Sequence, residues 1–256
     1  MREQARENKK AWEYRAYEHW SHQGSPREKA AAIQNDPMAC LKAHQAYFQD
    51  VRGLKIANPC GSNGRKAVPL ALLGADVTVF DISEENRRYA LELAACAGVS
   101  IGYEVGDFCE TDIHTYGGAF DMVYAEGGVL HYFSDIDAFT GILYAVTKAN
   151  GTLILSDFHP FRKTDRENPT MLTGGVHVTG GDYFDSRVHE GELAYRGFFA
   201  GEEQDAFPKC LLRHYTLSEI INSVIGAGFA VKEFQEHPSR RDGKLPGEFT
   251  LVAAKP

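Results

Sequence analysis

The sequence predicts an α/β fold whose core is a doubly wound, mostly parallel sheet. Between Leu54 and Ser156, short apolar segments typical of strands alternate with helix-like segments, and such alternation produces parallel strands joined by crossover helices. Near the C-terminus, the strand-like segments 229–237 and 247–255 flank the turn-rich stretch PSRRDGKLP, which predicts an antiparallel pair. We therefore expect a single domain over residues 1–256, with N-terminal helices and an inserted lid.

The first part of the chain, residues 1–52, is expected to form a helical cap. Residues 5–20 place Trp12 and Trp20 at helical spacing with charged residues between them, which describes an amphipathic helix. Asp36 can cap a second helix, because the proline that follows it suits the first helical position.

Residues 53–157 carry the repeated strand and helix units. Strands are expected at 54–57, 75–81, 99–105, 120–125 and 152–156. Gly74 and Gly98 are the expected ends of the first two crossover helices, Ser83 is the expected N-cap of the second, and a further helix is expected over 135–148.

The periodicity breaks down over residues 158–213, where GGVHVTGGDYF and HEGELAYRGFF are rich in glycine and aromatic residues. We expect this segment to be a lid inserted over the carboxyl edge of the sheet, where open α/β folds bind ligands. Residues 214–256 then supply a C-terminal helix, opened by a capping box from Thr216 to Glu219, and the strand pair.

The composition indicates a soluble, cytoplasmic protein. Hydrophobic residues make up 43% of the chain and charged residues 24%, no apolar run is long enough to cross a bilayer, and the N-terminus MREQARENKK does not resemble an export signal. The five cysteines are scattered without a CxxC pair, which suits a reducing compartment and predicts neither disulfides nor zinc. The histidines also lack the spacing of metal ligands, so no metal site is expected.

Small and polar residues end three successive strand-like segments. The turn Cys60–Gly64 would let a ligand approach the backbone closely, although it is not a GxxxxGK[ST] phosphate loop. Asp81 could accept both hydroxyl hydrogens of a ribose. Asp107 could accept from the amine of an adenine while Phe108 packs on the ring, but a helix N-cap and a core phenylalanine would explain the same pair.

These motifs resemble those of class I S-adenosylmethionine-dependent methyltransferases, including bacterial small-molecule members. The resemblance covers residues 54–156 closely, the C-terminal helix and strands more loosely, and rests on NPCGSNG, VTVFDIS, VGDF and EGGVLHYF with LILSDFHP. It implies a Rossmann-like fold of seven strands and S-adenosylmethionine as the cofactor. The cofactor-binding residues expected from it are Asn58, Cys60, Gly61, Ser62, Asn63, Gly64, Asp81, Ile82, Asp107, Phe108, Glu126, Gly127 and Gly128.

Two departures from the family pattern keep other functions open. Asn58 stands where the family usually has an acidic residue, and Cys60 and Ser62 stand where glycines are usual, so a regulatory or scaffold protein that binds the cofactor without catalysis is an alternative. A nicotinamide-dependent oxidoreductase is weaker, because GSNGRK lacks the full GxGxxG turn and no second catalytic domain follows.

For methyl transfer, the protein mainly has to align the acceptor with the methyl group, since the cofactor supplies the reactivity. A general base is required only for an acceptor that arrives protonated. His131 and His159 are the favoured candidate bases because both follow strands whose carboxyl ends face the cofactor, although a structural role would explain either one. The candidate acceptor-binding residues are Tyr132, Tyr183, Tyr195 and His214, and packing within the lid or core is the competing explanation for the aromatic ones.

The acceptor is expected to be a small molecule. A net charge of −8 disfavours nucleic acid, and the one basic cluster, SRRDGK at 239–244, is expected to be a solvated loop. No membrane partner is expected, a protein acceptor stays open, and the sequence leaves the oligomeric state undetermined. The N-terminal helix with Trp12 and Trp20 could close over the cofactor, as such helices do in similar methyltransferases.

Overall fold

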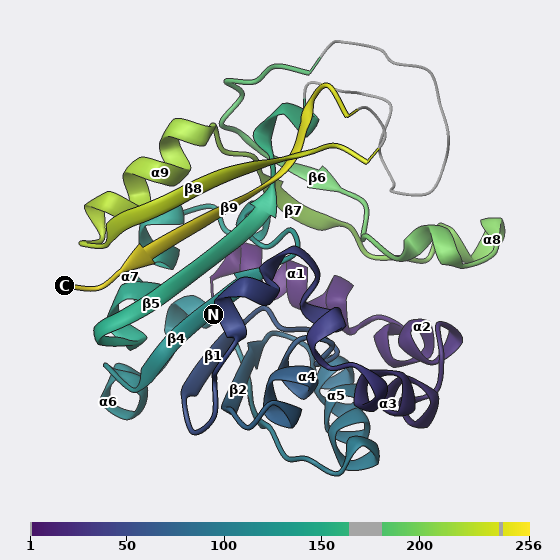
Figure 1. The fold of residues 1–256 in the computed structure, drawn as a ribbon. Helices are drawn as coiled ribbons and strands as arrows, with labels where there is room; N and C mark the ends of the chain where they lie inside the picture. The colour runs from purple at the N-terminus through teal and green to yellow at the C-terminus, as the bar shows by residue number, and fades with distance from the viewer. Residues whose placement is uncertain (1, 164–180, 241–242) are drawn as a thin grey trace.

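The computed structural model describes residues 2–163, 181–240 and 243–256. Its core is one sheet of seven strands: β1 (Lys55–Pro59), β2 (Asp76–Asp81), β3 (Gly102–Val105), β4 (Phe120–Glu126), β5 (Thr147–Phe158), β8 (Ala230–Pro238) and β9 (Pro246–Ala254). The strands lie in the order β3-β2-β1-β4-β5-β9-β8 (Figure 1). The first five run parallel, whereas β9 is antiparallel to both β5 and β8. The predicted doubly wound α/β fold is therefore confirmed.

Helices cover both faces of the sheet (Figure 1). One face packs against α3 (Pro26–Asn35), α4 (Ala67–Leu72) and α5 (Glu84–Ala97), and the other packs against α7 (Ile136–Val146) and α9 (Leu217–Gly226). Successive side chains of a strand point to opposite faces, so in β1 Ile56 joins the first core cluster and Ala57 joins the second. When helices cover both faces of an open α/β sheet, ligands bind at the carboxyl ends of its strands.

The helix boundaries follow the predicted capping residues. Ser83 accepts a hydrogen bond from the backbone N–H of Asn86, and α5 ends at Gly98, whose φ of 73° is easy only for glycine. Thr216 and Glu219 form the expected capping box of α9. Short helices occur between the main elements as η2 (Phe108–Glu110), α6 (Ile113–Tyr116) and η3 (Leu130–Tyr132).

The expectation of one helix over residues 5–20 is wrong at its centre. The chain forms α1 (Glu3–Glu13) and α2 (Ala16–His22), and between them Arg15 has a left-handed φ of 56°. The hydroxyl of Tyr195 donates to the carbonyl of Tyr14 at 2.8 Å, and Arg15 pairs with Glu18. Tertiary contacts thus fix a break that helical spacing does not reveal. The second expected helix is a kinked 3-10 helix, η1 (Met38–Phe48).

The expected lid region contains a two-stranded sheet of β6 (Val188–Gly191) and β7 (Cys210–Arg213). Around it lie the short helices η4 (Pro160–Lys163), η5 (Arg196–Phe198) and α8 (Gly201–Gln204). Residues 164–180 of the expected lid and residues 241–242 of the expected basic loop lie outside the described residues.

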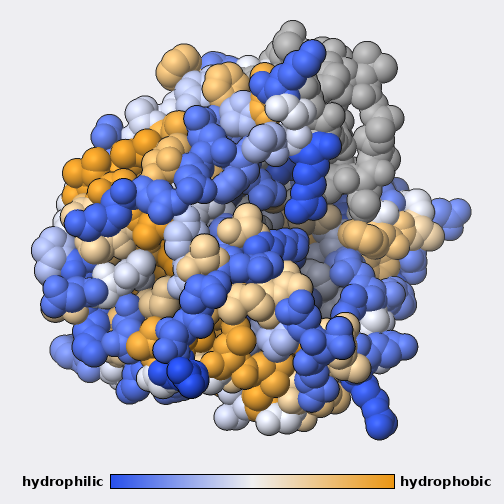
Figure 2. All heavy atoms as spheres, in the orientation of Figure 1, coloured by the Kyte–Doolittle hydropathy of each residue, from blue (hydrophilic) through white to orange (hydrophobic). Residues whose placement is uncertain are grey.

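The visible surface is mixed in character. Figure 2 shows hydrophilic residues spread over the face drawn there, with hydrophobic residues in separate groups between them. Within residues 2–163, 181–240 and 243–256, no helix combines the length and the hydrophobicity that crossing a bilayer requires. All five cysteines are free thiols.

Candidate functional site

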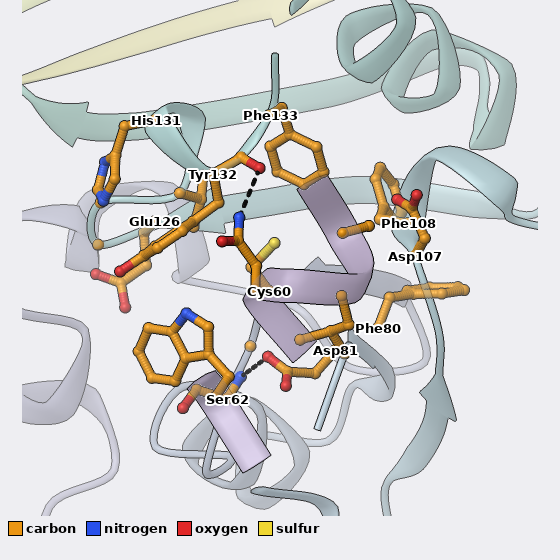
Figure 3. Close-up of a pocket in the computed structure, with 18 of the residues that line it drawn as sticks. Cys60, Ser62, Phe80, Asp81, Asp107, Phe108, Glu126, His131, Tyr132 and Phe133 are labelled. Carbon is orange, nitrogen blue, oxygen red and sulfur yellow. Dashed lines mark hydrogen bonds between the residues drawn. The ribbon is translucent and has the colours of Figure 1, made fainter. Parts of the chain in front are cut away.

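A cavity of about 260 Å³ lies at the carboxyl ends of the central strands (Figure 3). Its walls include Asn58 from β1, Asp81 from β2 and Glu126 from β4, together with Asp107, which follows β3. Because β1 lies between β2 and β4, the crossovers leave β1 in opposite directions, and ligands of open α/β sheets bind at such a switch point. The sheet topology therefore brings together side chains that are far apart in the sequence.

Most of the predicted site residues line this one cavity. They are Asn58, Cys60, Gly61, Ser62, Asp81, Ile82, Asp107, Phe108, Glu126, Gly127, Gly128, His131 and Tyr132. Six predicted residues are not among its lining residues: Asn63, Gly64, His159, Tyr183, Tyr195 and His214.

The loop after β1 has the backbone of a glycine-rich turn at two positions that are not glycine. Cys60 has a φ of 53° and Ser62 a φ of 49°, both in the left-handed region. Gly61 cannot be replaced without a shift, since a Cβ there would lie 2.3 Å from Oδ1 of Asn58. Gly64, with a φ of 78°, instead packs against Ala90 of α5, which explains why it does not line the cavity.

Asp81 is buried and held by the protein on both oxygens. Its Oδ2 accepts from the backbone N–H of Ser62 at 3.0 Å, and its Oδ1 accepts from the N–H of Ser83 and the side-chain amide of Asn86, each also at 3.0 Å. Burial is the largest influence on its pKa and raises it, against the opposing effect of these hydrogen bonds. The carboxylate is thus fixed in place at the cavity wall before any ligand arrives.

Asp107 combines the two roles that the sequence left open. Its Oδ1 caps η2 by accepting from the N–H of Cys109 at 3.0 Å, while its Oδ2 is buried without a hydrogen-bond partner in the described part of the chain. Phe108 packs edge-on against Phe80 and Phe139, with centroids 5.5 Å from each. The aspartate is a helix cap that still has one free oxygen, and Phe108 is a core residue at the cavity wall.

Three buried polar atoms at the cavity lack a partner among the described residues: Oδ1 of Asn58, Oγ of Ser62 and Oδ2 of Asp107. Each such atom costs roughly 1–3 kcal/mol when it stays unsatisfied. All three can accept hydrogen bonds, so a ligand with several N–H or O–H groups would satisfy them. An amino-acid nucleoside such as S-adenosylmethionine carries donors of this kind, and the residues present therefore fit it.

Glu126 begins a turn in which two glycines are required. Its Oε1 lies 3.2 Å from Nη2 of Arg65, and although burial by itself would raise the pKa of Glu126, Arg65 and Lys66 outweigh it and the pKa is lowered. Gly127 and Gly128 have φ values of 93° and 84°, and a Cβ on Gly128 would lie 2.3 Å from the ring of Phe158. A charged carboxylate and closely approached backbone therefore share one corner of the cavity.

His131 is the predicted base that reaches the cavity. Burial lowers its pKa to about 3, and the neighbouring His214, Arg162 and His189 act in the same direction. The imidazole is thus neutral at physiological pH and able to accept a proton or a hydrogen bond.

Asp157 stabilises the turn that carries His131 through hydrogen bonds to its backbone. Its Oδ2 accepts from the backbone N–H groups of Val129 and Leu130 at 2.8 Å each. Burial raises the pKa of Asp157 to about 6, although these backbone hydrogen bonds favour the ionised form. The end of β5 thereby positions the residues that follow β4.

His159 is not among the residues that line the cavity, so the geometry gives no support to its prediction as a second base. Its side chain is 1% exposed, its Nε2 lies 2.9 Å from Oε1 of Glu236 on β8, and its Nδ1 accepts from the N–H of Phe161 at 3.2 Å. The chain after β5 turns towards the strand pair instead of the cavity, because the backbone N–H of His159 also donates to the carbonyl of Gly247.

Three predicted acceptor residues also lie elsewhere. Tyr195 is buried beneath the N-terminal helices, where its ring stacks on His19 with centroids 4.5 Å apart. The hydroxyl of Tyr183 accepts from the backbone N–H of Leu217 at the start of α9. His214 sits behind His131, with ring centroids 6.1 Å apart. Of the acceptor residues proposed from the sequence, only Tyr132 lines the cavity.

The sequence did not predict most of the residues of helix α1 and its surroundings that cover the cavity, which we call its roof. Helix α1 covers the cavity, and the lining residues that it and its surroundings contribute are Arg2, Gln4, Ala5, Asn8, Trp12 and Trp20. The side-chain amide of Asn8 forms two hydrogen bonds with the backbone of Leu211 in β7, as the backbone of a paired strand would. Its Oδ1 accepts from the N–H of Leu211 at 2.7 Å, and its Nδ2 donates to the carbonyl of Leu211 at 3.0 Å. The spacing of the tryptophans signalled a covering helix, but nothing in the sequence marks Asn8.

The other lining residues not predicted are mostly neighbours of predicted ones: Arg65, Lys66, Phe80, Gly106, Val129, Phe133, Ser134, Phe158 and Ala194. In the described ranges, no group of three or more His, Cys, Asp or Glu side chains is arranged to hold a metal ion.

Comparison with known proteins agrees with this geometry. Residues 59–155 match the family model described as "Methyltransferase domain". No curated protein sequence matches the chain significantly. The similar solved structures include an S-adenosylmethionine-dependent methyltransferase from Mesorhizobium loti, at 21% identity and a TM-score of 0.62, covering 83% of this chain and 95% of that one.

Two further structures extend the likeness. A putative S-adenosylmethionine-dependent methyltransferase from Listeria monocytogenes is 19% identical with a TM-score of 0.64, over 85% of this chain and 98% of that one. The magnesium protoporphyrin IX methyltransferase of Synechocystis PCC 6803, solved with SAH bound, is 17% identical with a TM-score of 0.60, over 99% and 100%. These matches agree with the resemblance found in the sequence: residues 59–155 match the model of a methyltransferase domain, and the chain shares the fold of these structures.

Proposed function

We propose that this methyltransferase domain binds S-adenosylmethionine in the cavity at the strand ends and transfers its methyl group to a small molecule. The observation that carries the proposal is the set of three unsatisfied acceptor atoms, on Asn58, Ser62 and Asp107, gathered at one cavity. Asp81, the fixed carboxylate between them in the strand order, supports the assignment because a ribose offers two hydroxyl donors.

Each end of the cofactor has a counterpart in the cavity wall. Asp107 suits the adenine amine through its free Oδ2, and the apolar rings of Phe80 and Phe108 suit the adenine ring. Asp81 suits the ribose. The loop from Asn58 to Ser62, with the turn at Gly127, suits the methionine part, where close backbone approach is needed.

The protein's own contribution to the reaction is positioning and proton acceptance. When bound, S-adenosylmethionine supplies an electrophilic methyl group on a sulfonium. His131 and Tyr132 line the cavity beside Glu126, where they would orient the acceptor. The neutral imidazole of His131 would take the proton of an acceptor that arrives protonated, and α1 would keep water out.

A small acceptor is supported by the enclosure of the site. The cavity is roofed by α1, which Asn8 fastens to β7, and a macromolecule would have to displace that roof. The net charge of −8 gives no support to nucleic acid, and the free cysteines suit the cytoplasm. We propose no membrane partner.

Thermal unfolding with added ligands tests the proposal. S-adenosylhomocysteine and S-adenosylmethionine are expected to stabilise the protein, by roughly 2.7 kcal/mol at a hundred times the Kd, whereas NADH and ATP are not. Asp81→Ala is expected to abolish the shift. Stabilisation by NADH alone would favour an oxidoreductase, and no shift with any ligand would reject cofactor binding. Binding without turnover in an acceptor screen would favour the regulatory or scaffold alternative.

A further inference from the structure

Trp20 on α2 is connected to Asp81 by a chain of two hydrogen bonds. Trp20 lines the cavity as part of its roof, and its Nε1 donates to Oδ1 of Asn86 on α5 at 2.8 Å. Nδ2 of Asn86 in turn donates to Oδ1 of Asp81 at 3.0 Å. Asp81 lies at the cavity wall (Figure 3). One side chain of α5 thus joins a roof residue to the buried carboxylate.

The two partners of Asn86 allow its amide only one orientation. An indole N–H can only donate a hydrogen bond, and an ionised carboxylate can only accept one. The reversed amide would place its NH2 group against the indole N–H of Trp20 and its oxygen against Asp81. Asn86 is only 1% exposed, so neither mismatch would be relieved by solvent. Trp20 therefore helps to keep the donor of Asn86 directed at the carboxylate.

The chain depends on the packing of the N-terminal helices against α5. At the end of α1, Glu13 accepts a hydrogen bond from the backbone N–H of Glu84, the first residue of α5, at 3.0 Å. On α2, the hydroxyl of Tyr17 donates to Oε2 of Glu92 at 2.5 Å. The helices that cover the cavity therefore also contact the helix that follows Asp81.

We propose that Trp20 and Asn86 are positioning residues that orient the Asp81 carboxylate for the ribose hydroxyls of the ligand. The inference rests on the proposed function, because it assumes that the ligand is S-adenosylmethionine or its product. It adds a residue that does not line the cavity, Asn86, and gives Trp20 a role besides covering the site.

Calorimetric binding of two probe molecules to the full chain tests this role. S-adenosylhomocysteine has both ribose hydroxyls, and its 2′,3′-dideoxy analogue has neither. The wild-type protein should prefer S-adenosylhomocysteine by roughly tenfold to a hundredfold, because hydrogen bonds to a charged group are lost with the analogue. Trp20→Phe keeps an aromatic ring but removes the indole N–H, and it should reduce this preference by roughly twofold to tenfold.

Asn86→Asp interrupts the chain at its centre. The variant keeps an acceptor for Trp20 and places an acidic residue in the first turn of α5, which favours folding, but it has no donor for Asp81. It should reduce the preference at least as much as Trp20→Phe does. The double variant should reduce it no further than Asn86→Asp alone, because Trp20 acts through Asn86.

Tyr17→Phe is the matched control. It also removes one hydrogen bond between α2 and α5, but Tyr17 does not belong to the chain that ends at Asp81 and is not a lining residue of the cavity. The control should keep the wild-type preference. A lower preference in this variant would assign the effect to helix packing and overturn the positioning role.

The remaining outcomes are distinct. A merely structural role of Trp20 and Asn86 would weaken both probes equally, so an unchanged preference in their variants would overturn the inference, and so would additive losses in the double variant. Equal affinity of the wild-type protein for both probes would overturn the assignment of Asp81 to the ribose and the inference with it. Failure of the wild-type protein to bind either probe would instead overturn the proposed function.

Discussion

The carboxylate of Asp81 accepts a hydrogen bond from the backbone N–H of Ser62, and this 3.0 Å contact joins the end of β2 to the loop after β1. Ser62 has a φ of 49°, and this left-handed conformation costs a non-glycine residue about 1–2 kcal/mol. The hydrogen bond to Asp81 helps to hold Ser62 in this conformation. The loop thus keeps the shape of a glycine-rich turn because neighbouring groups enforce it.

Substitution of Ser62 should reveal this cost. Ser62→Gly relieves the left-handed backbone, whereas Ser62→Ala loses the same hydroxyl and keeps the Cβ. We expect the glycine variant to be more stable than the alanine variant by about 1 kcal/mol, less the greater entropy of glycine in the unfolded chain. Urea denaturation measures the difference, and an alanine variant as stable as the glycine variant would show that the loop is unstrained.

The two histidines proposed as bases should behave differently. His131→Gln is expected to lower kcat by roughly a hundredfold or more for an acceptor that must lose a proton, because general base catalysis contributes that much. His159→Gln should leave kcat unchanged, since His159 lies against Glu236 and away from the cavity. Single-turnover kinetics with each variant, after confirming S-adenosylhomocysteine binding, makes the comparison. Equal losses would restore His159 as a candidate.

Stability should fall in mild acid, and His131 should contribute to the fall. Its pKa of about 3 in the folded protein is below the value of about 6.5 expected in the unfolded chain. The unfolded state therefore binds the proton first as the pH falls, so stability is lost between about pH 6.5 and 3.

Urea titrations at pH 7.5 and pH 5 check this prediction. The difference in unfolding free energy between the two pH values should be smaller in His131→Gln than in the wild type. His22→Gln, at an exposed position, serves as the control and should keep the wild-type difference. An unchanged difference in His131→Gln would mean that this imidazole titrates normally in the folded protein.

The roof of the cavity should depend on Asn8. Asn8→Ala leaves both the N–H and the carbonyl of Leu211 without their side-chain partner, which should cost roughly 1–3 kcal/mol. S-adenosylhomocysteine should also dissociate faster, because α1 is released from β7. Stopped-flow displacement measures the rate, with Asn222→Ala on the exposed surface of α9 as a control. Loss of stability with an unchanged dissociation rate would show that α1 does not limit ligand exit.

The sequence predicted the sheet, and the edge of the sheet at which the cavity lies, because local signals suffice there. Glycine stops, capping residues and alternating apolar segments determine each crossover unit, and strand ends of a parallel sheet meet at one edge. Asp81 and Asp107 line the cavity for that reason, since Asp81 ends β2 and Asp107 comes shortly after β3.

The predictions failed where long-range contacts decide. The break at Arg15 depends on Tyr195, and the position of His159 depends on β8 and β9, which lie far along the chain. Lys66 was overlooked as a site residue because burial of a lysine is set by the segments packed around it, here including Cys40. Such contacts leave no periodic or spacing signal.

The fastening of α1 to β7 also has a consequence for biosynthesis. Residues 55–158 contain the floor of the cavity, whereas the partner that holds the roof, Leu211, is made later. At roughly 5–20 residues per second, a ribosome completes the floor several seconds before the roof can be held shut. The N-terminal helix, although synthesised first, therefore cannot be fastened to β7 until residue 211 has been made.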